Sequence, residues 1–325
     1  ESSEAIPLSL PISTKSFTKL SLLCFKSFSF NIEFSYFRIP FNAEDVFIDG
    51  RKKPLCNIPE MLKGSIPVDG GFLIIEAKDY DDFIKQDPNS IQFIRNIVGA
   101  EEFINNKKRY CLWLEHANPA DIRKCPLVLE RVKQVREMRL ASSKEATRKF
   151  ADYPMRFMEI RQPDSDYILV PSHSSENRRY IPLGFMSPDV ISTNANLIIP
   201  NATLYHFGIL TSNVHMAWMR VVCGRLEMRY RYSNTIVYNN FPWPTITPEQ
   251  EAEISRTAQA ILDARNLYPD CSLADLYDEV TMPVELRRAH QANDRAVMRA
   301  YGLPVTTSES DTVAHLFKLY EELTK

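Results

Sequence analysis

The sequence predicts an α+β fold, in which a domain of mixed strands and helices is followed by an all-helical domain. Between residues 42 and 245, short apolar or alternating segments are separated by proline, glycine and asparagine, a pattern typical of strands and turns. Residues 246–325 instead carry long segments with helical periodicity. A length of 325 residues, with 44% hydrophobic and 25% charged residues, accommodates both domains in a globular protein.

The first half of the chain contains one expected hairpin and one expected long helix. Residues 1–41 are rich in Ser and Phe, alternate in places as strands do, and are assigned to neither domain. The segment EEFINNKKRYCLWL predicts a β-hairpin with Asn105 and Asn106 at its turn, since asparagine tolerates positive φ. Apolar positions then recur with helical spacing from Pro126 to Ala151. Short extended segments return over residues 154–200.

The second half predicts a helix, a strand and a helical tail. Asn201 can cap a helix that runs to Val222 with a break near Ser212, and Gly224 suits its C-terminal cap. The segment GRLEMRYRYS (residues 224–233) alternates with period 2 and predicts one strand. A capping box at Thr247 then places a domain boundary near 245. Helices are expected over residues 248–267, 283–301, closed by Gly302, and 309–323.

Composition and missing motifs exclude several classes of protein. Glycine is scarce, at 9 of 325 residues, and neither GxGxxG nor GxxxxGK[ST] occurs, which excludes the common phosphate-binding loops. The hydrolase signatures GxSxG and HExxH are also missing. Six cysteines without a CxxC pair indicate reduced thiols. With no signal-like start and no long apolar run, we expect a cytoplasmic protein with no metal site and no membrane partner.

Charge is distributed unevenly along the chain, whose net charge is −2. Residues 107–179 contain 16 Lys/Arg and 10 Asp/Glu, whereas residues 246–325 contain 8 and 14. A polyanion would therefore meet the middle of the chain. The candidate phosphate contacts are basic side chains of the expected helix and of the segment SSENRRY, with an ordinary solvated face as the alternative: Arg131, Lys133, Arg136, Arg139, Lys144, Arg148, Arg178 and Arg179.

A second constellation imitates a nuclease centre. In IPVDGGFLIIEAKDY, Asp69 precedes a strand that ends in Glu76, Ala77 and Lys78. Two carboxylates could hold Mg²⁺ while the lysine stabilises an attacking water. The alternative is a strand that ends in a solvated run of charges.

The strand expected at GRLEMRYRYS carries Glu227, Arg229 and Arg231 on one face. Glutamate accepts from cytosine N4, and arginine binds guanine O6 and N7, so Glu227 and Arg229 could read one C·G pair. Leu226, Met228, Tyr230 and Tyr232 would anchor the opposite face. Charge pairing along a surface strand explains the same composition equally well.

Long stretches of the sequence resemble one family. From about Asn42 onward, the chain is similar to the C-terminal part of MmeI-type (type IIL) restriction–modification enzymes and their adenine-specific DNA methyltransferase relatives. The resemblance covers more than four fifths of the chain. It implies a target recognition domain over residues 42–245 and a helical C-terminal domain over residues 246–325. The segments that carry it include DGGFLII, GAEEFINNKKRYCLWL, IRKCPLVLERVKQVREMRLAS, ILVPSHSSENRRYIPLGF, IIPNATLYHFGILTSNVHMAWMRVVCGRL and YRYSNTIVYNNFPWP.

The resemblance also implies roles. Family members join a nuclease, an S-adenosylmethionine-dependent methyltransferase and this recognition module in one polypeptide. The methyltransferase motifs, NPPY/F and a glycine-rich cofactor loop, do not occur here. No cofactor is therefore expected in this chain, and S-adenosylmethionine belongs to a methyltransferase domain of the same or a companion chain. The family's base-reading pair falls on Glu227 and Arg229, and Ala195 and Arg231 are its expected neighbours at another base.

We therefore expect a sequence-specific double-stranded DNA recognition module that positions a target adenine for N6 methylation by a catalytic domain absent from this chain. One alternative is a Mg²⁺-dependent nuclease at Asp69, Glu76 and Lys78. Another is a scaffold whose acidic helical tail docks protein.

Overall fold

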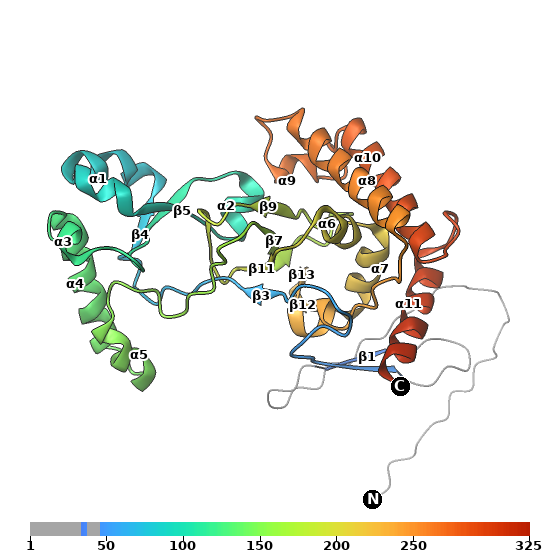
Figure 1. Ribbon diagram of the computed structural model, residues 1–325, viewed down its shortest axis with the longest axis horizontal. Helices are drawn as coiled ribbons and strands as arrows, with labels where there is room; N and C mark the ends of the chain where they lie inside the picture. The colour runs from blue at the N-terminus through green and yellow to red at the C-terminus, as the bar shows by residue number, and fades with distance from the viewer. Residues whose placement is uncertain (1–33, 38–45) are drawn as a thin grey trace, which may run out of the picture.

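The computed structural model describes residues 34–37 and 46–325, whose strands form four sheets. The molecule is elongated, with helices α1, α3, α4 and α5 at one end of the long axis and helices α8, α10 and α11 at the other (Figure 1). Most of the strands lie between these two groups of helices (Figure 1). No helix in the described ranges combines the length and apolarity that a membrane crossing requires.

The first sheet lies toward the end of the molecule that carries α1, α3, α4 and α5 (Figure 1). Its strand order is β10-β5-β6-β4, with β10 parallel to β5 and the other pairs antiparallel. Leu73, Ile75, Leu112, Val128 and Val135 are fully buried in its core. The elements are β4 (Ile74–Glu76), α1 (Tyr80–Gln86), β5 (Ile94–Val98), α2 (Ala100–Asn105), β6 (Arg109–Leu112), α3 (Pro119–Ile122), α4 (Pro126–Leu140), α5 (Glu145–Lys149) and β10 (Ile191–Ser192).

The hairpin predicted around Asn105 and Asn106 is wrong, because the first half of that segment is helix α2. The Glu102 carboxylate accepts a hydrogen bond from the Gly99 N–H at 2.8 Å, which closes the first turn of the helix. Asn106 then adopts a left-handed conformation with φ 52° and ends it. The asparagine does occupy a positive-φ position, as its residue type suggested, but it terminates a helix.

The helix predicted over residues 126–151 is divided. Helix α4 ends at Leu140, α5 begins only at Glu145, and a 3-10 turn follows over Phe150–Asp152. The Ser142 and Ser143 carbonyls accept from the Arg148 guanidinium at 2.8 Å each, so the interruption is held by its own hydrogen bonds. Serine competes with helical hydrogen bonding through its side chain, which favours a break at this point.

The second sheet lies at the centre of the molecule, with the order β3-β11-β7-β9 and antiparallel pairing. Two helices follow it, and the break predicted near Ser212 is confirmed because Ser212 is the N-cap of the second one. Thr203, not Asn201, caps the first. The elements are β3 (Leu62–Lys63), β7 (Tyr167–Pro171), β9 (Gly184–Met186), β11 (Asn196–Pro200), α6 (Leu204–Leu210) and α7 (Asn213–Val222).

The helical tail follows its prediction closely. The Thr247 hydroxyl accepts from the Gln250 N–H, and the Gln250 side chain accepts from the Thr247 N–H, which confirms the capping box. Gly302, with φ 67°, ends the third of the four helices. These are α8 (Pro248–Asn266), α9 (Leu273–Leu276), α10 (Val284–Ala300) and α11 (Glu309–Thr324).

One hydrophobic core is continuous across residue 245. It joins Trp218 and Phe241 to Ile254 and Leu316, all buried. Helix α8 approaches α6 so closely at Gly208 that a Cβ there would lie 2.7 Å from Ile254 Cγ2. Residues 246–325 are therefore packed directly onto the preceding part of the chain.

The two remaining sheets are small. Strand β1 (Phe34–Phe37) pairs antiparallel with β2 (Val46–Asp49), which confirms a strand in one part of the Ser- and Phe-rich segment, and the other residues of 1–41 lie outside the described ranges. The last sheet has the order β12-β13-β8. Its strands are β8 (His173–Ser174), β12 (Gly224–Leu226) and β13 (Arg229–Arg231).

Candidate nucleic-acid interface

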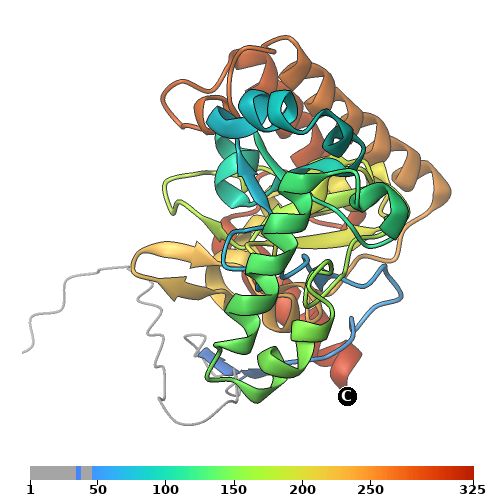
Figure 2. The same ribbon diagram turned by 90° about the vertical axis from the view of Figure 1, so that its left-hand side faces the viewer.

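The segment predicted as one strand, GRLEMRYRYS, is a β-hairpin. Strands β12 and β13 pair antiparallel, with Leu226 opposite Arg229 and Gly224 opposite Arg231. Glu227 and Met228 form the connection, and Glu227 has φ 54°. The hairpin projects from the body of the molecule (Figure 2). Glu227 therefore lies at an exposed tip, not in a row with Arg229.

The pairing register determines which side chains share a face, because directly opposed residues in antiparallel strands point the same way. The outward face carries Leu226 opposite Arg229 in one row, and Arg231 opposite His173 of β8 in the next. Leu226 is 52% exposed and Met228 69%, so the prediction that both anchor the strand is wrong. Arg229 and Arg231 are exposed as expected.

The inward face is anchored by tyrosine, as predicted. Tyr230 and Tyr232 are both 5% exposed. The Tyr232 hydroxyl lies 2.9 Å from His215 Nε2 on α7, and burial lowers the pKa of His215 to about 3. The Arg225 guanidinium stacks over the Tyr230 ring at 4.0 Å. The hairpin is thus attached to the core through its base and presents its outward face to solvent.

The charges of the outward face are not paired with one another. Within residues 34–37 and 46–325, no ion pair involves Glu227, Arg229 or Arg231. The alternative of charge pairing along the strand is therefore not what the structure adopts. The pKa of His173 is lowered, first by burial and then by the positive charges of Arg231 and Arg229. The face is electropositive and its imidazole is neutral at pH 7.

Ala195 lies beside this hairpin, joined to it by two backbone hydrogen bonds. The Ala195 carbonyl accepts from the Ser172 N–H at 3.1 Å, and the Ser172 carbonyl accepts from the Tyr232 N–H at 2.8 Å. Ala195 is exposed in the loop between β10 and β11. The structure therefore brings Ala195 and Arg231 to one region, although 36 positions separate them in the sequence.

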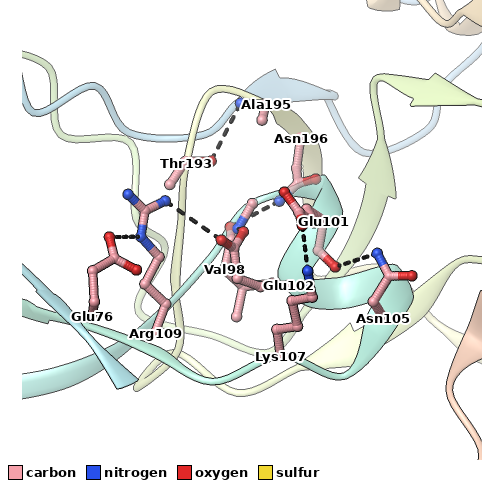
Figure 3. A network of polar contacts seen from close by, with 11 residues as sticks. Glu76, Val98, Glu101, Glu102, Asn105, Lys107, Arg109, Thr193, Ala195 and Asn196 are labelled. Atoms are coloured by element: carbon pink, nitrogen blue, oxygen red, sulfur yellow. Dashed lines mark hydrogen bonds and ion pairs between the residues drawn. The ribbon is translucent and has the colours of Figure 1, made fainter. Parts of the chain in front are cut away.

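A polar network supports the Ala195 loop from the other side (Figure 3). The Val98 carbonyl accepts from the Asn196 side chain at 2.9 Å and from the Thr193 N–H at 3.0 Å. A Cβ on Gly99 would lie 3.8 Å from Ala195 Cβ and 3.3 Å from Thr193 Oγ1. Helix α2 thus begins in close contact with the loop that carries Ala195.

Two of the predicted phosphate contacts serve the fold instead. Arg139 is fully buried, and its guanidinium donates to five backbone carbonyls, those of Pro67, Val68, Phe150, Tyr153 and Arg156. Arg131 donates to the carbonyls of Phe72 and Ile74 at 3.0 and 2.6 Å. For Arg139 the prediction is wrong, because no donor is left to reach a phosphate. Burial lowers the pKa of both guanidinium groups.

The remaining basic candidates are accessible to different degrees. Lys133, Arg136, Lys144 and Arg148 are exposed on α4 and around α5. Arg179 is exposed and Arg178 is half-buried. These two line a cleft of about 540 Å³ together with two acidic side chains of the tail, Glu279 and Glu309. Their role as phosphate contacts stays a prediction.

The nuclease candidates are not arranged as a metal centre. The Asp69 carboxylate is buried and accepts from the Leu73 N–H at 2.7 Å, so it stabilises a turn. Glu76 instead forms an ion pair with Arg109 at 3.1 Å (Figure 3). Lys78 is exposed. Among the described residues, no group of three or more His, Cys, Asp or Glu side chains could hold a metal ion.

Sequence reasoning missed three residues of this surface: Ser172, His173 and Leu226. His173 reaches it through the pairing of β8 with β13, and Ser172 through its bonds to Ala195 and Tyr232. These contacts join segments more than 20 residues apart, for which a single sequence contains no signal. Leu226 was assigned to the wrong face because the turn was not recognised.

Comparison with known proteins places this chain in a family. Residues 42–245 match the family described as MmeI, target recognition domain, and residues 246–325 match MmeI, C-terminal domain. "DNA methyltransferase A" of Bacillus subtilis (strain 168) is 38% identical over 284 residues, which cover 87% of this chain and 32% of that protein. The chain therefore spans about a third of this curated relative.

A solved structure is also similar. It is that of the Type IIL restriction-modification enzyme MmeI in complex with DNA, with a TM-score of 0.82 and 43% sequence identity, covering 90% of this chain and 42% of that one. The level of identity and the shared fold agree with the two family matches. The chain thus belongs to the MmeI family, and carries that family's target recognition domain followed by its C-terminal domain.

Proposed function

We propose that this chain recognises a specific double-stranded DNA sequence within a restriction–modification enzyme that methylates adenine at N6. The single observation that carries the proposal is the outward face of the β12-β13-β8 sheet. There, Arg229 and Arg231 project from a hairpin whose base is anchored in the core, with Glu227 at the tip. A two-stranded ribbon fits the major groove of B-DNA, where base edges can be read.

Within this proposal, Glu227 and Arg229 read one C·G pair. Both side chains are exposed and neither has an ionic partner among the described residues, so both are available to base edges. Arg231 and Ala195 meet a second base. The backbone hydrogen bonds of Ser172 to Ala195 and to Tyr232 hold the two segments side by side, which supports this assignment. The exposed cations of α4 and α5 contact phosphates. Arg139 is excluded from that set because it is buried.

The methylation step belongs to a part of the enzyme beyond these residues. The chain covers 32% of a relative named DNA methyltransferase A and 42% of the MmeI enzyme. We propose that a methyltransferase domain of the same or a companion chain binds S-adenosylmethionine, and that this module places the target adenine before it. No residue of this chain is assigned to catalysis.

The test is a selection of bound duplexes from a randomised double-stranded DNA library. Glu227→Lys combined with Arg229→Asp should change the preferred base from C to G at one position and leave the others unchanged. Lysine then binds guanine and aspartate accepts from cytosine on the opposite strand. The wild-type affinity should also fall steeply with salt, since phosphate contacts release counterions. A protein-docking scaffold would show neither behaviour.

The matched control exchanges charges in the same way far from the hairpin. Lys318 and Glu322 form an exposed ion pair on α11, so Lys318→Asp with Glu322→Lys also leaves the net charge unchanged. This control should select the same sequences as the wild type. An unaltered base preference in the hairpin variant would overturn the assignment of Glu227 and Arg229.

A further inference from the structure

We propose that the turn between α2 and β6, which carries Lys107 and Lys108, is an additional phosphate-binding surface beside the base that Ala195 meets. The proposal rests on the DNA-recognition function above and extends it to a segment with no assigned role. Three observations support it: the charge of an adjoining cleft, the availability of the two lysines and the position of the turn relative to Ala195.

The turn borders a cleft of about 990 Å³ between the first sheet and the C-terminal end of α8. The cleft is strongly cationic. Among the described residues that line it, Glu102 is the only acid, and the cations are Arg95, Lys107, Lys108, Arg109 and Arg265. A polyanion is therefore the partner that its charge fits.

Not all of these cations are free to bind. Arg109 forms ion pairs with Glu76 at 3.1 Å and with Glu102 at 3.5 Å, so its charge is largely neutralised. Arg265 donates to the Leu183 carbonyl and to the Tyr277 hydroxyl. Arg95 donates from Nη1 to the Gln92 and Ile94 carbonyls at 3.1 Å each. The most available charge is therefore on the lysines of the turn.

Both lysines are accessible. Lys108 is exposed and has no ionic partner among the described residues. Lys107 pairs with Glu101, but the two side chains are 59% and 66% exposed. Exposed pairs of this kind contribute about 0–1 kcal/mol, so a phosphate can replace the glutamate readily.

The position of the turn suits a contact that flanks a base. Helix α2 begins at Gly99, where an added Cβ would lie 3.8 Å from Ala195 Cβ. The six residues of α2 separate Gly99 from the turn, which corresponds to roughly 9 Å at the rise of an α-helix. This is comparable to the major groove, which is about 12 Å wide. With Ala195 at a base edge, the turn reaches the sugar–phosphate wall.

The turn is also fixed before any ligand binds. Asn106 has φ 52°, and the Lys107 N–H donates to the Glu102 carbonyl at 3.0 Å. The helix that leads to it starts from the capping hydrogen bond of Gly99 to Glu102. The lysines are therefore presented from an ordered backbone.

The experiment compares Lys107→Gln/Lys108→Gln with the wild type on a duplex recovered by the wild-type selection. Fluorescence anisotropy gives Kd between about 50 and 200 mM KCl, the range over which phosphate contacts are resolved. Each lost contact should make the log–log slope shallower by about 0.9, so the affinity ratio should change about tenfold across this range for two lysines. The base preference of the variant should stay that of the wild type.

The control is Lys318→Gln/Lys325→Gln, which removes two exposed lysines on α11 and directly after it and should leave the slope unchanged. An unchanged slope in the Lys107/Lys108 variant would overturn the proposal, as would an altered base preference. The slope can be measured on any duplex that the wild type binds. A wild type that binds duplexes without base preference would contradict the proposed recognition function. The salt slopes of the wild type and the Lys107/Lys108 variant could still be compared, so the present proposal would be tested independently.

Discussion

The hydroxyl of Tyr232 lies 2.9 Å from Nε2 of His215, and the two residues are 5% and 2% exposed. This contact joins the base of the β12-β13 hairpin to helix α7. The other ring nitrogen, Nδ1, has no hydrogen-bond partner among the described residues. The imidazole therefore depends on Tyr232 for its side-chain hydrogen bond.

Replacing Tyr232 by Phe should destabilise the protein by about 1–3 kcal/mol, because His215 Nε2 is then left buried without a partner. Urea unfolding measures this change as a shift in the midpoint at constant slope. Tyr153→Phe is the control, since Tyr153 is 55% exposed and should show almost no effect. Equal stabilities for Tyr232→Phe and the wild type would mean that the buried bond contributes nothing net.

Acidification should destabilise the fold through the buried His215 and the half-buried His206. Burial lowers the pKa of His215 to about 3 and of His206 to about 4, whereas an unfolded histidine titrates near 6.5. Below about pH 6.5 the unfolded chain takes up protons that the folded chain does not, so stability is retained above that pH and falls as the pH decreases toward the folded values. Each histidine contributes a slope of up to about 1.4 kcal/mol per pH unit.

Urea unfolding at about pH 7.5 and pH 5 tests this window. Asp294, whose pKa burial raises to about 6, opposes the effect below that pH, but it is a single carboxyl. His215→Gln should reduce the stability difference between the two pH values, and the exposed His116→Gln should not. A difference that His215→Gln leaves unaltered would assign the acid sensitivity to other groups.

Arg139 and Arg136 lie on the same helix, but only the substitution of Arg139 should change the free energy of unfolding. Arg139→Lys should lower the free energy of unfolding by at least about 3 kcal/mol, since an ammonium cannot satisfy all five carbonyls that the guanidinium binds. Arg136→Lys, at an exposed position, should be neutral in the same thermal or urea measurement. Equal effects of the two substitutions would contradict the structural role of Arg139.

Gly208 should tolerate no side chain. A Cβ at this position would lie 2.7 Å from Ile254 Cγ2 and 3.0 Å from Asn293 Oδ1, so Gly208→Ala forces α8 away from α6. We expect a loss of about 1–3 kcal/mol, typical of an overpacked core. Gly224→Ala is a suitable comparison, because its nearest contacts would be 3.8 Å or longer. Because the core is continuous across residue 245, the segments before and after that residue should unfold in one cooperative transition.

The helical tail could be predicted because its signals are local. Thr247 and Gln250 satisfy one another across a single turn, and Gly302 ends a helix by its own backbone freedom. The burial of Arg139 could not be predicted, since all five of its acceptors lie outside helix α4. A count of basic residues on a helix does not reveal which side of that helix is packed.

The β12-β13 hairpin could not be predicted from sequence for a different reason. A two-residue turn preserves the alternation of the sequence, so periodicity cannot distinguish the hairpin from one long strand. It nevertheless inverts the faces, because Leu226 is opposite Arg229 and points with it. The dipeptide Glu227-Met228 contains none of the usual turn residues. Without a turn signal, the charged positions were recognised correctly as exposed while Leu226 and Met228 were not.

The strained backbone at the hairpin tip leads to the last prediction, in which stability and recognition change in opposite directions. Glu227 has φ 54°, a left-handed conformation that disfavours residues with a Cβ by about 1 kcal/mol or more. Glycine adopts it freely, so Glu227→Gly should leave the protein as stable as the wild type or up to about 1 kcal/mol more stable. The same change removes the carboxylate that we propose reads cytosine, and discrimination at that base should fall by about 1–3 kcal/mol.

Urea unfolding and the duplex selection measure the two effects separately. Glu227→Ala is the matched variant, because it removes the same carboxylate without relieving the backbone. It should lose base discrimination to the same extent and gain no stability. A loss of stability in Glu227→Gly together with the loss of discrimination would mean that Glu227 holds the turn in place. Retained discrimination in both variants would mean that another residue reads this base. Arg229, which is exposed on the same hairpin, would then be the residue to test.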